Sequence, residues 1–189
     1  LFFSNNAGKT EEIKKLFKKY KINLCSLADF NLNLEPKETG NSFADNAKIK
    51  SLFGYEKIKL PCFADDSGIC IEALGWKPGV YSKRFIENFK NNDECFKYIF
   101  RKVLASGKNR AYFQTSICLT LKNNYHIVFE GKINGKISTK IIGKNGFGFD
   151  PIFTPDMYQK TFGQMKSYEK NSISHRSIAI NKLLNFLTN

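Results

Sequence analysis

Two adjacent aspartates, Asp65 and Asp66, follow the apolar run 62–64 and precede Ser67-Gly68. The apolar run predicts a buried strand that ends at these aspartates, where α/β sheets usually bind ligands. Two neighbouring carboxylates cannot both point into a core, so we expect at least one to face a cleft or solvent. Their oxygens suit Mg²⁺, which keeps several waters and shares substrate phosphates. An ordinary Asp-Ser-Gly turn is the alternative.

A second polar segment, Ser4-Asn5-Asn6-Ala7-Gly8-Lys9-Thr10, separates the first predicted strand from the first predicted helix. Its end imitates a P-loop, but the P-loop pattern requires glycine where Phe3 stands, so that interpretation fails. A strand-to-helix turn still presents backbone N–H groups, short polar side chains and one lysine to an anion. The alternative is an ordinary helix cap made by asparagine and serine.

A glycine-rich loop, residues 143–151, carries Phe147, Phe149 and one acid, Asp150. Its glycines would let a flat ring reach an aromatic face, and Asp150 would accept a hydrogen bond from that ring. Gly-Phe loops also occur simply as tight turns, so the loop alone is a weak indication of binding.

Three side chains, Lys170, His175 and Arg176, lie near the start of the last predicted helix. Positive side chains there oppose the helix dipole, which indicates an anion or an acceptor-rich partner. His175 by itself would be interpreted as a cap or surface histidine.

The chain has 189 residues and a net charge of +13, with 42% hydrophobic and 25% charged residues. This composition excludes a disordered or collagen-like chain. No apolar run approaches the roughly 18 residues of a membrane helix, and no signal peptide opens the sequence, so we expect a cytoplasmic protein without membrane contact. Residues 1–4 look like a strand entered partway along, which suggests that further residues precede Leu1.

The positive charge comes mostly from lysine, with 26 Lys and four Arg. Base reading depends on bidentate arginine, and stacking modules depend on clustered aromatic residues, so we expect no specific nucleic acid partner. The five cysteines include no C-x-x-C pair, which supports neither a zinc site nor a disulfide framework, and we expect buried reduced thiols.

Strand and helix patterns alternate early and a β-meander follows, so the sequence predicts an α/β fold in which helices flank a mixed sheet. We interpret residues 1–189 as a single domain. The predicted helices cover about 9–20, 42–55 and 174–187, with another beginning at Asn91-x-x-Glu94. The predicted strands cover about 22–27, 62–64, 111–121, 125–132 and 136–142, with a tight turn at Asn123-Asn124.

In order and spacing, these segments resemble the inosine/xanthosine triphosphate pyrophosphatases, also called dITP/XTP pyrophosphatases. The resemblance spans nearly the whole chain and includes residues 38–47, 73–82, 147–153 and 174–176. It implies two lobes with the substrate in a central cleft, and usually a homodimer. The implied reaction is Mg²⁺-dependent hydrolysis of ITP, dITP or XTP to the monophosphate and pyrophosphate, which cleanses the nucleotide pool.

The resemblance also implies roles for individual residues. Asp66 would activate water and bind Mg²⁺, and Ser67 would contact the substrate. The triphosphate would be held by Ser4, Asn5, Asn6, Ala7, Gly8 and Lys9. The purine would be enclosed and read by Phe147, Gly148, Phe149, Asp150, Lys170, His175 and Arg176.

One position departs from the family pattern. Two acids commonly precede Thr39-Gly40, the first being the usual metal ligand, but here Lys37 takes its place and only Glu38 is kept. Either Glu38 or Glu35 then takes over as metal ligand, or the metal contact is weakened. We take Glu38 as the second candidate ligand beside Asp66.

Lysine and arginine carry only donors, so they complement the 6-oxo group of hypoxanthine or xanthine and oppose the 6-amino group of adenine. Two other hypotheses stay open. One is a basic nucleic-acid-binding module, and the other is a pyrophosphatase for canonical-base or modified pyrimidine triphosphates.

Overall fold

The computed structural model describes residues 1–18, 20–122 and 125–189, so the predicted turn at Asn123-Asn124 lies outside the described residues. The chain forms two compact units. Unit 1 consists of residues 1–66, 115–131 and 175–189, and unit 2 of residues 67–114 and 132–174. Two units agree with the two lobes that the sequence led us to expect.

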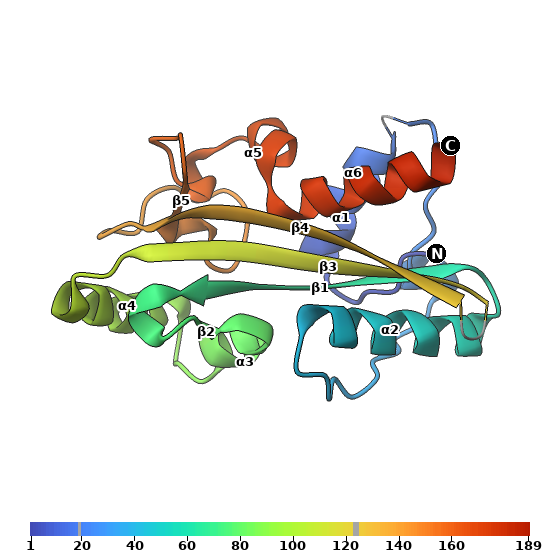
Figure 1. The fold of residues 1–189 in the computed structure, drawn as a ribbon, viewed down its shortest axis with the longest axis horizontal. Coiled ribbons are helices and arrows are strands. Elements are labelled where there is room, and N and C mark those ends of the chain that lie inside the picture. The colour runs from blue at the N-terminus through green and yellow to red at the C-terminus, as the bar shows by residue number, and fades with distance from the viewer. Residues whose placement is uncertain (19, 123–124) are drawn as a thin grey trace. The chain divides into compact units, whose positions relative to one another are not determined.

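One five-stranded sheet has the strand order β2-β1-β3-β4-β5 (Figure 1). The pairs β1–β2 and β4–β5 are antiparallel. Phe2 adds isolated parallel bridges to Ser26 and Phe63, so the pairing is mixed, as predicted. The strands are β1 (Cys62–Ile71), β2 (Lys77–Pro78), β3 (Arg110–Lys122), β4 (Tyr125–Ile137) and β5 (Phe153–Pro155).

The predicted α/β class is confirmed by the helices around this sheet. Two helix starts follow their sequence signals: the Ser42 and Asp45 side chains cap each other's backbone, and the Asn91 side chain accepts from the Glu94 N–H. The α-helices are α1 (Ala7–Lys18), α2 (Phe43–Ile58), α3 (Ser82–Glu87), α4 (Asn92–Ser106), α5 (Ser167–Ile173) and α6 (His175–Thr188). Short 3₁₀ helices are η1 (Leu27–Phe30), η2 (Glu72–Leu74), η3 (Gly79–Tyr81), η4 (Asp150–Ile152) and η5 (Phe162–Gln164).

Two predicted strands are wrong because other backbone groups take their hydrogen bonds. In 22–27 only Ser26 forms a bridge. In 136–142, β4 stops at Ile137, and the N–H groups of Ser138 and Ile142 donate to carbonyls of Ile152 and Pro151. Alternating apolar residues predict an extended chain, but a strand also needs a neighbouring strand.

Unit 1 packs α1 and α6 on one face of its strands and α2 on the other (Figure 1). The first face is filled by an apolar cluster in which the ring of Phe63 stacks on Phe2 at 5.1 Å and on Phe17 at 5.5 Å. Gly131 of β4 lies so close to α6 that a Cβ there would be 2.0 Å from the His175 carbonyl oxygen. The glycine thus allows α6 to begin directly against the strand.

Unit 2 has its own core around the rings of Phe113, Phe153 and Phe162, whose centroids lie 4.8 to 6.0 Å apart. Residues Phe96 and Ile99 of α4 belong to the same buried cluster. Because Phe153 and Phe162 both follow the glycine-rich loop in the chain, this core anchors the carboxyl-terminal side of the segment that carries Asp150.

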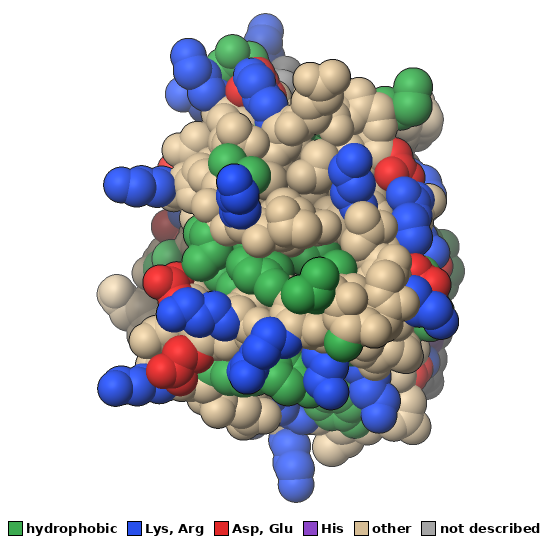
Figure 2. Space-filling view, turned by 90° about the vertical axis from the view of Figure 1, so that its left-hand side faces the viewer, with side chains coloured by type: hydrophobic (Ala, Val, Ile, Leu, Met, Phe, Trp, Pro, Cys, Tyr) green, Lys and Arg blue, Asp and Glu red, His purple; other side chains and the backbone are tan. Residues whose placement is uncertain are grey.

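Lysine and arginine side chains are scattered around an apolar stretch on the face seen in Figure 2, and they outnumber the acidic ones there. This scatter is typical of solvated lysines. Among the described helices, none is long and apolar enough to cross a membrane.

The cysteines follow the prediction of buried thiols at four of five positions. Cys62, Cys70, Cys95 and Cys118 are buried, whereas Cys25 is exposed. Burial raises the pKa of the Cys62 thiol to about 12 and that of Cys95 to about 11. Cys25 lies in the segment 22–25 that was predicted as strand and carries no regular structure.

We therefore predict that a thiol reagent such as DTNB labels one cysteine in the native protein, because a buried, protonated thiol is a poor nucleophile. Cys25→Ser should abolish this labelling, and all remaining thiols should react in denaturant. Labelling of native Cys25→Ser at the wild-type rate would contradict the assignment.

Candidate active site

Asp65 and Asp66 lie within β1, which continues to Ile71, so the turn predicted at these aspartates does not form. Successive side chains of a strand point to opposite faces, which sends the two carboxylates in opposite directions. Both are buried, with residue exposures of 2% and 6%. Neither carboxylate therefore lies in bulk solvent, because each face of β1 supplies cations for its own carboxylate. That one of them faces a cleft stays a prediction.

On the face covered by α1 and α6, Asp65 binds two cations. Its Oδ2 lies 3.0 Å from Lys9 Nζ and 3.5 Å from Arg176 Nε. Arg176 Nη1 also donates to Glu12 Oε2. Lys9 and Glu12 are three residues apart on α1 and so share one side of the helix. One buried carboxylate thus connects the first turn of α1 with the first turn of α6.

On the face covered by α2, Asp66 contacts one amide and one ammonium. Asn46 Nδ2 donates to Asp66 Oδ2 at 3.1 Å, and Lys50 Nζ lies 3.2 Å from Asp66 Oδ1. Asn46 and Lys50 are one helical turn apart. Lys50 Nζ also lies 2.7 Å from Glu38 Oε1, and the Gly40 N–H donates to Asn46 Oδ1. The Lys50 ammonium of α2 therefore contacts both Asp66 and Glu38.

Burial and charge shift the pKa values of this group. Burial raises the pKa of Asp66 despite the attraction of Lys50 and Lys9. Burial lowers the pKa of Lys9, against the opposing effect of Asp65. At Lys50 burial acts downward, but the attraction of Asp66, Asp65 and Glu38 outweighs it and raises the pKa. Asp66 is thus a stronger base than an exposed aspartate.

The donor set around Lys50 fits a hard divalent cation. Asp66 and Glu38 offer carboxylate oxygens already gathered around one positive charge, and Mg²⁺ prefers one or two carboxylates completed by water and phosphate. Within the described residues, no set of three or more His, Cys, Asp or Glu could hold a metal.

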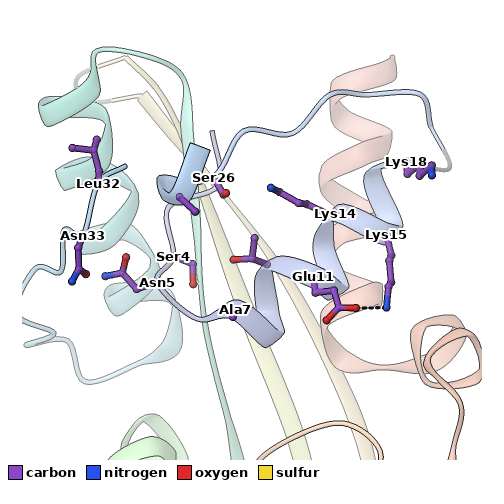
Figure 3. A pocket seen from close by; sticks show the side chains of 12 residues that line it. Ser4, Asn5, Ala7, Glu11, Lys14, Lys15, Lys18, Ser26, Leu32 and Asn33 are labelled. Carbon is purple, nitrogen blue, oxygen red and sulfur yellow. Dashed lines mark hydrogen bonds and ion pairs between the residues drawn. The ribbon is translucent and has the colours of Figure 1, made fainter. Parts of the chain in front are cut away.

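The residues of the segment 4–9, which was predicted to hold phosphates, have different surroundings in the structure. Lys9 turns to Asp65, whereas Ser4, Asn5 and Ala7 border a cavity of about 680 Å³ in unit 1 (Figure 3). Asn6 caps α1, since its Oδ1 accepts from the Lys9 N–H at 3.0 Å. The helix-cap alternative is therefore correct for Asn6.

In unit 2, Asp150 and Lys170 form a buried ion pair beside two aromatic rings. Lys170 Nζ lies 2.7 Å from Asp150 Oδ2, 4.9 Å from the centroid of Phe147 and 5.6 Å from that of Phe162. The Phe147 N–H donates to the same oxygen. Gly146 has φ +75°, and a Cβ there would be 1.9 Å from Asp150 Oδ2, so only glycine permits this loop.

Other predicted residues differ in their surroundings. Phe147 is 37% exposed, but Phe149 is buried in the core against Phe96. Ser67 continues β1 and is half-buried. Lys170 lies in the last turn of α5, where the helix dipole favours a cation, and not at the start of the last helix as predicted.

His175 and Arg176 do begin the last helix, and both are buried. They belong to unit 1, whereas Lys170 and Gly148 of the predicted purine group belong to unit 2. Within unit 1 the structure brings Arg176 to Asp65, the carboxylate that also pairs with Lys9.

Three contacting residues were not identified from the sequence: Glu12, Asn46 and Lys50. The spacing of each along a predicted helix could have indicated its place. Glu12 follows Lys9 by three residues, and Asn46 and Lys50 are four apart in a helix whose capping box was recognised. Lys50 was hidden among 26 lysines, since only the fold shows which of them is buried beside carboxylates.

Residues 1–186 match the sequence profile of the Ham1 family. The chain is 40% identical to the dITP/XTP pyrophosphatase of Thermoanaerobacter pseudethanolicus over 97% of this chain and 93% of that protein. It is 37% identical to the dITP/XTP pyrophosphatase of Christiangramia forsetii over 100% and 98%. A HAM1 protein structure from Coxiella burnetii matches with a TM-score of 0.88 and 32% identity over 99% and 96% of the two chains. The chain therefore belongs to the Ham1 family.

Proposed function

We propose that this protein is a nucleoside-triphosphate pyrophosphatase that hydrolyses deaminated purine nucleoside triphosphates (ITP, dITP and XTP) to the monophosphate and pyrophosphate. The observation that carries the proposal is the buried Asp66, a carboxylate with raised pKa that shares Lys50 with a second carboxylate, Glu38. Full-length relatives named dITP/XTP pyrophosphatase support the substrate class.

Asp66 is the proposed general base. Hydrolysis of a phosphoanhydride needs a water oriented toward phosphorus and relieved of its proton, and a buried carboxylate with raised pKa accepts that proton more readily. Asn46 and Lys50 fix the direction of the carboxylate through one contact to each of its oxygens. Burial raises the pKa of Asp66, and the attraction of Lys50 opposes that rise and so favours the charged carboxylate.

Asp66 and Glu38 are the proposed ligands of Mg²⁺, which when bound would offset the charge that builds up on the phosphate oxygens. Lys9, the strand-to-helix turn Ser4 to Gly8 and Ser67 would bind the phosphate chain. Asp65 and Arg176 keep Lys9 in place, because the ammonium would otherwise be a buried unpaired charge.

The Asp150–Lys170 pair supports recognition of a 6-oxopurine. The Lys170 ammonium can donate only, which suits the 6-oxo acceptor, and the Asp150 carboxylate can accept only, which suits the N1–H of hypoxanthine or xanthine. Adenine presents the opposite pattern at both positions. We propose that Phe147 stacks on the base, with Gly148, Phe149, His175 and Arg176 helping to enclose it. The proposal includes a cytoplasmic homodimer.

The substrate class is tested by measuring pyrophosphate release from ITP, dITP, XTP, ATP, GTP and pyrimidine triphosphates, each with and without Mg²⁺. We expect selective, Mg²⁺-dependent release from the three deaminated purine nucleotides, because of the donor and acceptor pattern at Lys170 and Asp150. Comparable turnover of ATP and GTP, or orthophosphate as the primary product, would refute the proposal.

Asp66→Asn keeps the size of the side chain and removes its charge and most of its basicity. We expect kcat for ITP at saturating Mg²⁺ to fall by at least about two orders of magnitude, the lower range for loss of a general base. Nucleotide binding should largely persist. The assignment is wrong if Asp66→Asn keeps near-normal turnover while a folded Asp65→Asn is inactive.

Asp65→Asn should act mainly on stability. It leaves Lys9 and Arg176 without a shared counter-charge, and breaking a buried ion pair costs about 3 kcal/mol or more of unfolding free energy. Asp156→Asn is the matched control, because Asp156 pairs with Arg110 on the surface and an exposed pair is worth about 1 kcal/mol or less. Urea unfolding of the two variants measures the difference, and equal losses would refute a structural role for Asp65.

A further inference from the structure

The glycine-rich loop, residues 143–151, lies directly against the segment 161–165 of the same unit. The Asn145 N–H donates to the Gly163 carbonyl oxygen at 2.9 Å. Gly143, with φ +89°, approaches the same carbonyl so closely that a Cβ there would be 2.0 Å from its oxygen. The backbones of the loop and the segment are therefore in contact where the loop begins.

Two side-chain hydrogen bonds join the same two stretches of chain. Asn145 Nδ2 donates to the Met165 carbonyl oxygen at 3.0 Å. Directly before the loop, the hydroxyl of the buried Thr161 donates to the Ile142 carbonyl oxygen at 2.6 Å. Asn145 itself is exposed, so its side chain can be changed without removing buried apolar contacts.

The Asn145 hydrogen bond connects the two halves of the proposed base-reading pair. Asn145 precedes Asp150 by five positions in the loop, and Met165 precedes Lys170 by five positions. The Lys170 ammonium and the Phe147 N–H meet at one oxygen of Asp150, at 2.7 and 2.8 Å. The Asn145–Met165 hydrogen bond and this ion pair therefore close a ring that contains both halves of the pair.

The loop needs such a connection because its own backbone is permissive. Gly146 and Gly148 both have positive φ, of +75° and +58°, and glycine has many alternative conformations to these. The exposed Phe147 lies between them. A donor and an acceptor recognise one base edge only while their spacing is kept, and a misplacement of about 1 Å is costly. Hydrogen bonds from outside the loop must therefore fix its shape.

We propose that Asn145 is a positioning residue for base selection. Its amide holds the loop against the segment that leads into α5, which keeps Phe147 and Asp150 in register with Lys170. Asn145 acts through the loop and not on the base. The inference rests on the proposed function and deepens it, since it names a residue that sets the preference for a 6-oxopurine over a 6-aminopurine.

The test is calorimetric titration of inosine 5′-monophosphate (IMP), AMP and pyrophosphate into the whole protein, so no hydrolysis is required. We expect Asn145→Ala to lower the affinity for IMP about tenfold, the effect of losing one hydrogen bond, and to change the affinities for AMP and pyrophosphate little. Asn145→Asp should lose at least as much, because a carboxylate cannot donate to the Met165 carbonyl. The matched control is Asn134→Ala, at an exposed asparagine on β4 of the same unit, which should bind like the wild type.

A lower ratio of IMP affinity to AMP affinity in both Asn145 variants, with pyrophosphate affinity and the urea midpoint unchanged, supports the positioning role. An unchanged ratio in Asn145→Ala would overturn it, and so would equal losses for IMP, AMP and pyrophosphate, which would indicate a general loosening of the fold. A wild type that binds IMP and AMP equally would overturn it as well. Failure to hydrolyse ITP refutes the proposed function alone, whereas selective hydrolysis with an unchanged ratio refutes only the role of Asn145.

Discussion

Two neighbouring carboxylates buried in one strand are the constraint on which unit 1 depends. A buried carboxylate is costly unless cations and hydrogen bonds surround it. Because Asp65 and Asp66 point to opposite faces of β1, the fold must supply cations from both sides. Lys9 and Arg176 come from one face and Lys50 from the other, which ties α1, α6 and α2 to the same two residues of the strand.

In the same arrangement, one aspartate contributes mainly to stability and the other is placed for chemistry. Asp65 contacts two cations, Lys9 and Arg176, and Arg176 also contacts Glu12. The Asp65 carboxylate therefore serves to hold these two side chains in place. Asp66 shares the Lys50 ammonium with Glu38, and burial raises its pKa despite the attraction of Lys50 and Lys9. Adjacent residues of one type therefore have different properties because their neighbours differ. Unit 2 repeats the principle with one pair, Asp150 and Lys170, placed against aromatic rings.

Local patterns predicted the elements whose stability is local. The capping residues at Ser42 and Asn91 located two helices, and apolar spacing located β3 and the last helix. The strands predicted at 22–27 and 136–142 failed because alternation says nothing about a pairing partner. The turn expected at Asp65-Asp66 failed for the opposite reason: polar residues continue a strand when distant cations neutralise them.

The sequence by itself determined the α/β class, the family resemblance and most residues that carry charge at the candidate site, because these depend on residue types and short spacings. Only the tertiary structure decided which carboxylate meets which cation. It selected Lys50 from 26 lysines, joined Glu12 to Arg176 across 164 positions, and placed Phe149 in the core while leaving Phe147 exposed. Such pairings depend on burial and on contacts between residues far apart in the chain, and no local pattern records them.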